Sequence, residues 1–263
     1  MKIASRPDGR WVVERDGAVS VIRYDSGTRR TMGIDGAAQL AGLVEERAAR
    51  LEPPVIVLVV DILHAELAEV REMGEGRPIA DWAPWLAAIN GLESYPNATI
   101  VAVPVQATCG GLELSLAADL RVAAPSARLG VLETRMGILP GAGGTQRLPE
   151  LIGTGNTALL VLTGEPVSGA EAHRMGLVQL IDEDPERAAI ELAQRIALIG
   201  PSVISAAKRA IAASRNRTAD GFRVEGRSFL AAVNLEATTA RIAAWLDDQA
   251  DGRNPALDPS PLP

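Results

Sequence analysis

The chain has 263 residues, of which 47% are hydrophobic and 22% are charged, and its formal net charge is −7. This composition is typical of a globular protein with one sizeable core, and it excludes a disordered polymer. One cysteine and two histidines exclude a disulfide framework and make a metal site a poor interpretation. The acidic charge balance, with no basic run, argues against a nucleic-acid partner.

Two features of the sequence bear on location. No apolar run reaches the roughly 18 residues that a membrane-spanning helix needs, and the longest run, Pro53 to Val60, has the length of a strand. Residues 1–7 contain no apolar segment of the kind that opens a secretory signal. We therefore expect a cytoplasmic protein with no membrane partner.

Strands and helices alternate over the first 180 or so residues, which predicts an α/β core with parallel strands. The predicted strands are the β-branched or apolar runs 11–15, 18–24, 55–60, 99–105, 120–124 and 127–131. The predicted helices are 34–51, a segment from Asp81 to Leu92 that Asp81 caps, 112–118, and one that opens after Gly144. The segment 61–78 is expected to be irregular.

The last third of the chain shows only helical periodicity, over 185–199, 202–214 and 222–247. Apolar residues lie on more than one face of these segments, which predicts burial from several sides and therefore association with other subunits. We divide the chain into an α/β core at residues 1–199, which carries the active site, and a helical region at 200–263. The proline-rich tail from Arg253 is expected to be frayed.

The most informative stretch begins where the predicted strand 99–105 leads into Cys109-Gly110-Gly111, directly ahead of a helix. Glycines let a ligand approach the backbone closely, and the N–H groups of a helix N-terminus favour negative charge. Such a site suits a developing oxyanion. A glycine pair before a helix is also a common turn. Cys109 itself is either a nucleophile or a small packed residue, and the lack of a histidine motif beside it favours packing.

Two glutamates accompany this turn. Glu113 lies in the first turn of the apolar helix, and Glu133 follows it 20 positions later, just before a glycine-rich loop. Two carboxylates in apolar surroundings are the pattern expected for acid–base work on one substrate. Taken singly, Glu113 could merely complement the helix dipole, and Glu133 could be a surface acid paired with Arg128 or Arg135.

Several motifs together carry a family resemblance over roughly residues 10 to 250. The sequence resembles the crotonase (enoyl-CoA hydratase/isomerase) superfamily, and the resemblance is strongest in the segments Gly110–Leu114, Ala118–Ala123, Gly130–Glu133 and Gly137–Leu148. It implies a spiral of β-β-α turns with a helical C-terminal trimerisation region, assembled as a homotrimer or a dimer of trimers.

The resemblance also implies roles for four residues. Glu113 and Glu133 match the two glutamates that hydratases of the family use for water addition. Gly110 matches the glycine whose N–H forms half of an oxyanion hole. The run Leu67–Met73 is similar to the family's G-A-D-x-K-E-M, which places Ala68 at the second donor position, although Leu67 and Glu69 replace the usual glycine and aspartate.

The expected function is hydration of a 2-enoyl thioester to the 3-hydroxyacyl thioester, with coenzyme A or a carrier protein as the acyl carrier. No metal and no cofactor apart from coenzyme A within the substrate is implied. The alternatives are another enolate chemistry on the same fold (double-bond isomerase, decarboxylase or C–C hydrolase) or a non-catalytic homologue. Retention of both glutamates favours hydration. Acyl chain length and pathway are not predicted by the sequence.

Overall fold

The computed structural model describes residues 9–25, 27, 29–76, 78–213, 229–230 and 236–250. A six-stranded sheet has the order β1-β2-β4-β6-β8-β11. Its strands are β1 (Arg10–Arg15), β2 (Val19–Asp25), β4 (Val55–Val59), β6 (Thr99–Val103), β8 (Leu120–Ala123) and β11 (Leu180–Ile181). β1 is antiparallel to β2, and every pairing from β2 to β11 is parallel, as the alternation of elements predicted.

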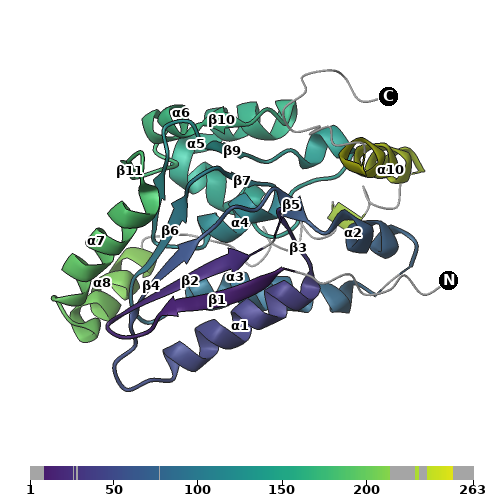
Figure 1. Ribbon diagram of the computed structural model, residues 1–263. Coiled ribbons are helices and arrows are strands. Elements are labelled where there is room, and N and C mark those ends of the chain that lie inside the picture. The colour runs from purple at the N-terminus through teal and green to yellow at the C-terminus, as the bar shows by residue number, and fades with distance from the viewer. Residues whose placement is uncertain are drawn as a thin grey trace.

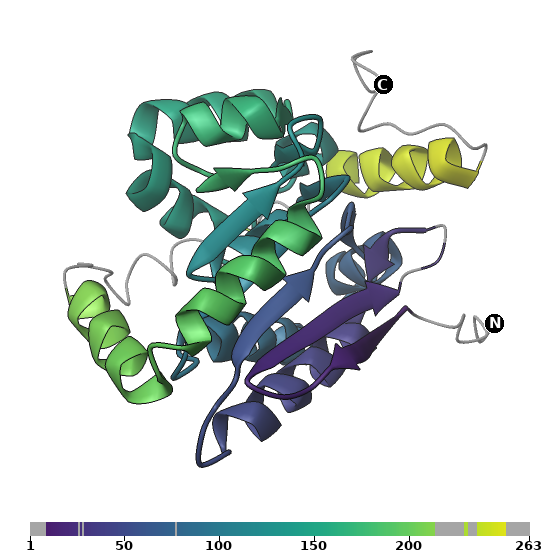
Figure 2. The same cartoon turned by 60° about the vertical axis from the view of Figure 1, so that its left-hand side comes forward.

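Helices cover both faces of this sheet (Figures 1 and 2). On one face, α1 (Ile34–Ala48) and α3 (Ala83–Glu93) pack against each other and against side chains such as Ile56 and Leu58 of β4. On the other face, α7 (Pro185–Ala197) crosses the sheet over Val55 and Val57. Strand β4 is therefore buried on both faces of the sheet, which explains its unbroken apolar sequence.

Two smaller sheets complete the core. One has the order β10-β9-β7 and contains β7 (Gln106–Thr108), β9 (Arg128–Gly130) and β10 (Val167–Ser168). The other pairs β3 (Thr31–Met32) with β5 (His64–Ala65). A strand of the large sheet is thus followed by a strand of a small sheet and then by a helix in β4-β5-α2, β6-β7-α4 and β8-β9-η2. This repeated unit is the β-β-α turn that the resemblance implied.

The remaining helices build the site and its surroundings. They are α2 (Leu67–Gly74), η1 (Ile79–Trp82), α4 (Gly110–Leu116), η2 (Glu133–Met136), α5 (Gly144–Thr163), α6 (Gly169–Arg174), α8 (Pro201–Ala213) and α10 (Glu236–Ala250). The α10 helix packs against α2 and η2, and its Trp245 is fully buried. Lys208 of α8 donates to the Asn97 carbonyl at 2.9 Å and pairs with Asp119 at 2.7 Å, which fastens α8 to the core.

Three expectations need correction. The segment 61–78 is not irregular, because it contains β5 and α2. Asp81 does not cap α3; it lies inside η1, and Trp82 is the residue that precedes the helix. The strand expected at 99–105 ends at Val103, and the chain then enters β7.

Parts of two other predictions lie outside the described residues. Of the helix expected at 222–247, the structure describes 229–230 and then α10, which ends at Ala250. The tail from Arg253 lies wholly outside the described residues, and the boundary at residue 200 stays a prediction. In the described part of the chain no single helix is long and apolar enough to span a membrane. The pair Pro185–Ala197 and Pro201–Arg209, bent by 101°, passes the same test of length and composition only when counted together.

Two glycines provide a matched test of the packing. A Cβ at Gly111 would lie 2.5 Å from the Ile62 carbonyl oxygen, whereas a Cβ at Gly42, on the exposed side of α1, would meet nothing within 4 Å. Gly111→Ala should lower the free energy of unfolding by at least about 2 kcal/mol through overpacking. Gly42→Ala should raise it by about 0.5–1 kcal/mol through helix propensity. Denaturant titration measures the free energy of unfolding of both variants. An equal change in the two variants would contradict the packing described.

Candidate active site

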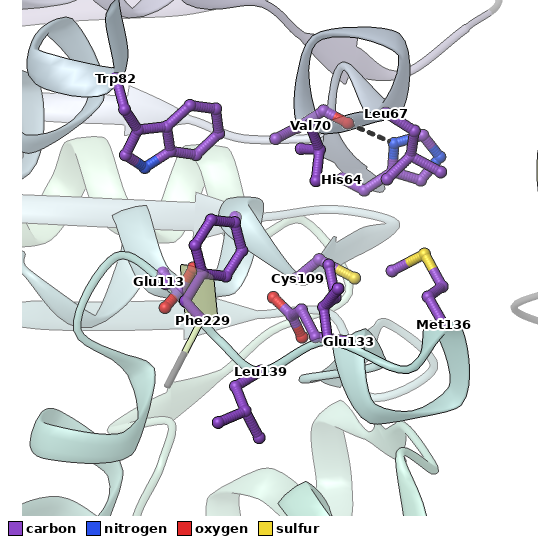
Figure 3. Close-up of a pocket in the computed structure, with 14 residues that line it drawn as sticks. His64, Leu67, Val70, Trp82, Cys109, Glu113, Glu133, Met136, Leu139 and Phe229 are labelled. Carbon is purple, nitrogen blue, oxygen red and sulfur yellow. Dashed lines mark hydrogen bonds between the residues drawn. The ribbon is translucent and has the colours of Figure 1, made fainter. Parts of the chain in front are cut away.

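A pocket lies where α2, α4 and η2 meet, with Phe229 on its border (Figure 3). Three of the four predicted site residues line it, namely Gly110, Glu113 and Glu133. They come from two successive β-β-α units, so the spiral of the chain brings together residues that the sequence separates. The fourth, Ala68, does not line this pocket.

The backbone turn ahead of α4 is held tightly. β7 and β9 run in parallel, and beyond their last pair the Cys109 nitrogen donates to the Gly130 carbonyl at 2.9 Å. Cys109 itself takes φ = 49°, a conformation that costs a non-glycine residue free energy. A Cβ on Gly110 would lie 3.1 Å from the Trp85 ring and 3.5 Å from the Ala65 nitrogen. The start of α4 is therefore pressed against the residues of β5.

Glu113 is held by another helix rather than by its own. Its side chain is almost fully buried, with the residue 3% exposed, and its Oε1 accepts from the Ala142 and Gly144 nitrogens, both at 2.8 Å. These N–H groups lie at the N-terminus of α5, where backbone donors and the helix dipole favour a negative charge. A Cβ at Gly144 would come within 3.1 Å of the same oxygen, so glycine permits this close approach. The interpretation that Glu113 only complements the dipole of its own helix, α4, therefore does not account for these contacts.

Glu133 opens the short helix η2 and is 4% exposed. This burial contradicts the alternative that Glu133 is a surface acid. The turn that carries it closes with Gly137 in the left-handed region, at φ = 80°, and the Ile138 nitrogen donates back to the Glu133 carbonyl at 3.1 Å. The two glutamates thus enter one pocket from separate, rigid elements (Figure 3).

The thiol of Cys109 lies in the same pocket and faces Glu133 (Figure 3). Burial, followed by the negative charge of Glu133, raises the pKa of this thiol well above its ordinary value. A raised pKa keeps the group as the neutral thiol, which is a poor nucleophile. The packed-residue interpretation of Cys109 is therefore the one that the structure supports.

Ala68 follows Leu67, which lines the pocket, but is not itself among the lining residues, and its role as a donor stays a prediction. Glu66 is the N-cap of α2, and its side chain accepts from the Ala68 nitrogen at 3.5 Å. The residues of this segment that line the pocket are His64, Ala65, Leu67 and Val70, and the Ala65 nitrogen lies close to Gly110.

The rest of the pocket wall is mostly apolar, and the sequence did not single it out. Trp82 stacks on Trp85, with ring centroids 5.4 Å apart, and on Phe229 at 6.4 Å. Val70 and Leu139 add aliphatic surface, so the wall suits an acyl group rather than a polar one. Among the residues that the structure describes, no group of three or more His, Cys, Asp or Glu side chains could hold a metal ion.

Comparison with known proteins decides the family. The enoyl-CoA hydratase/isomerase family model matches residues 67–243, which is more than half of the chain. The chain belongs to the enoyl-CoA hydratase/isomerase family. Its crotonase-like α/β architecture, predicted from the sequence, is confirmed by the match and by solved structures. One such structure, an enoyl-CoA hydratase from Bacillus anthracis, is 28% identical with a TM-score of 0.72, over 94% of this chain and 98% of that one.

Curated relatives of this family match over shorter stretches. One relative is the Homo sapiens protein named enoyl-CoA hydratase domain-containing protein 2, mitochondrial. The two chains are 40% identical over 172 residues, and this aligned stretch covers 63% of this chain and 59% of the human protein. The chain is 41% identical over 131 residues to the mitochondrial methylglutaconyl-CoA hydratase of Rattus norvegicus, covering 48% and 42% respectively. The chain thus spans about half the length of the curated relatives it matches.

The chemistry of Cys109 gives a direct test of the pocket's electrostatics. Because this thiol is 3% exposed and its pKa is raised by burial and by Glu133, it should not react with a disulfide reagent such as DTNB at pH 8 while the protein is folded. It should react fully in denaturant, where the chain's single cysteine serves as its own control. Rapid reaction of the folded protein would show that the thiol is exposed or ionised.

Proposed function

We propose that this protein is an enoyl thioester hydratase, which adds water across the 2,3 double bond of a 2-enoyl-CoA to give the 3-hydroxyacyl-CoA. The observation that carries the proposal is the presence of two buried carboxylates, Glu113 and Glu133, in one largely apolar pocket beside the N-terminus of α4. Hydration needs a group that orients a water and a group that moves its proton, and two carboxylates can divide these tasks. Coenzyme A as the carrier is supported by the names of the relatives, an enoyl-CoA hydratase domain-containing protein and a methylglutaconyl-CoA hydratase.

The thioester carbonyl would lie between two backbone N–H groups. Gly110 supplies one of them from the start of α4. We assign the second to Ala65, because it lines the pocket and its nitrogen lies close to Gly110.

The two donors would stabilise the enolate that forms when the double bond is attacked, and one such donor is typically worth about 3 kcal/mol. Glu113 orients the water, since its own position is set by the α5 N-terminus. The water oxygen bonds to C3, and Glu133 accepts the proton released and delivers it to C2. One water thus supplies both new bonds, and both carboxylates return to their starting state.

Two further expectations accompany this proposal. We propose a homotrimer or a dimer of trimers, which is supported by the exposed apolar side chains of Val203 and Ile211 on α8, 59% and 58% exposed. The cytoplasmic location stays a prediction, because several relatives carry the word mitochondrial in their names.

The acid pair is tested with crotonyl-CoA. The wild-type protein should remove the conjugated enoyl absorbance and add the mass of one water. Glu113→Gln and Glu133→Gln should each fold and lower kcat by roughly 10²-fold or more, which is the usual scale of general acid–base catalysis. Wild-type rates in both variants would exclude this mechanism, and a product without added water would indicate an isomerase.

The second donor is tested by removing single N–H groups. Ala65→Pro deletes the proposed donor, whereas Ala68→Pro deletes an N–H in the first turn of α2, where proline is tolerated. Ala65→Pro should lower kcat by about 10²-fold, and Ala68→Pro should retain most of the activity. Thermal melts confirm that each variant is folded. Loss of activity only in Ala68→Pro would restore the donor that the sequence resemblance implied.

A further inference from the structure

Arg147 is a buried cation close to the site that the steps above do not use. It lies in the first turns of α5 and is 1% exposed. Its guanidinium donates to the Ala142 carbonyl at 3.0 Å and pairs with Glu93, the last residue of α3, at 2.8 Å. An arginine so deeply buried requires partners for its charge, and the structure supplies them from two separate elements.

Ala142 connects this arginine with the site. Its carbonyl accepts from Arg147, while its N–H donates to Glu113 Oε1 at 2.8 Å. The backbone on both sides of one residue is thereby fixed, one side by the cation and the other by the carboxylate. The path from α3 to the pocket therefore runs through Glu93, Arg147, Ala142 and Glu113.

The loop that holds Glu113 is rich in glycine. Ala142 is followed by Gly143, which takes φ = 105°, and by Gly144, the other donor to Glu113. Glycines allow a wide range of backbone angles, so the loop needs an external anchor to keep two N–H groups aimed at one oxygen. A guanidinium can donate to a carbonyl and to a carboxylate at once because its donors form a rigid fork, and a lysine ammonium cannot reproduce that geometry.

We propose that Arg147, anchored by Glu93, is a positioning residue that fixes the Glu113 carboxylate through the backbone of Ala142. Its kinetic consequence rests on the proposed function, because it concerns how well Glu113 orients the water. Its structural consequence is independent of the proposed function. The N–H groups of Ala142 and Gly144 should stay protected from hydrogen exchange only while Arg147 holds the loop.

The kinetic test compares Arg147→Met with Arg47→Met. Arg47 is also buried, 2% exposed, and donates to Ser20 and to the Leu43 carbonyl, but it is not among the residues that line the pocket. Arg147→Met should lower kcat by about tenfold or more, with KM changed by less than about twofold. Arg47→Met should lower thermal stability without this loss of kcat. Arg147→Lys should fall between the wild type and Arg147→Met.

A double-mutant cycle identifies the route of the effect. If Arg147 acts through Glu113, adding Arg147→Met to Glu113→Ala should change the residual kcat little. Full additivity, or a wild-type kcat in Arg147→Met, would overturn the proposal.

Amide hydrogen exchange gives a readout that needs no activity. The segment 141–147 should exchange faster in Arg147→Met than in the wild type, and at the wild-type rate in Arg47→Met. If the wild type fails to hydrate any enoyl thioester, the proposed function falls, and exchange alone decides the positioning role. Faster exchange then supports it, and unchanged protection of this segment overturns it.

Discussion

The two hydrogen bonds from the N-terminus of α5 to the Glu113 carboxylate connect the candidate active site with the rest of the fold. They require α4 and α5 to meet at a fixed distance, and they require a glycine at position 144, because a Cβ there would crowd the carboxylate oxygen. The β-β-α repeat satisfies the distance, since β7 and β9 pair in parallel and deliver Cys109 and Glu133 to the same pocket. The position of one side chain thus depends on two successive turns of the chain.

Burial of both carboxylates has consequences for the neighbours. Burial of the thiol, followed by the negative charge of Glu133, raises the pKa of Cys109, which keeps that thiol neutral. The same surroundings strengthen any hydrogen bond from a backbone N–H to an enolate oxygen, because little water competes for it. The apolar wall that contains Trp82 and Phe229, with Trp85 stacked on Trp82, therefore contributes to the proposed chemistry as well as to the packing.

Much of the core follows from the sequence because its signals are local. The run Val55–Val59 is apolar throughout and forms a strand buried on both faces, and α7 shows clear amphipathic spacing after a proline. The segment with β5 and α2 was missed because its strand has two residues and its helix is short and capped by a glutamate, an uncommon N-cap. The glutamates were found through motif spacing. Ala65 and Arg147 were not, since the roles proposed for them depend on contacts across the fold.

The central claim is that a thioester carbonyl binds between Gly110 and Ala65, next to two carboxylates. A crystal structure with a non-reactive acyl-CoA analogue tests it most directly. The account predicts a carbonyl oxygen about 3 Å from the Gly110 and Ala65 nitrogens, which is normal hydrogen-bond reach, with C2 and C3 facing Glu113 and Glu133. An oxygen bound to the Ala68 nitrogen, or an acyl group that lies outside this pocket, would contradict the account.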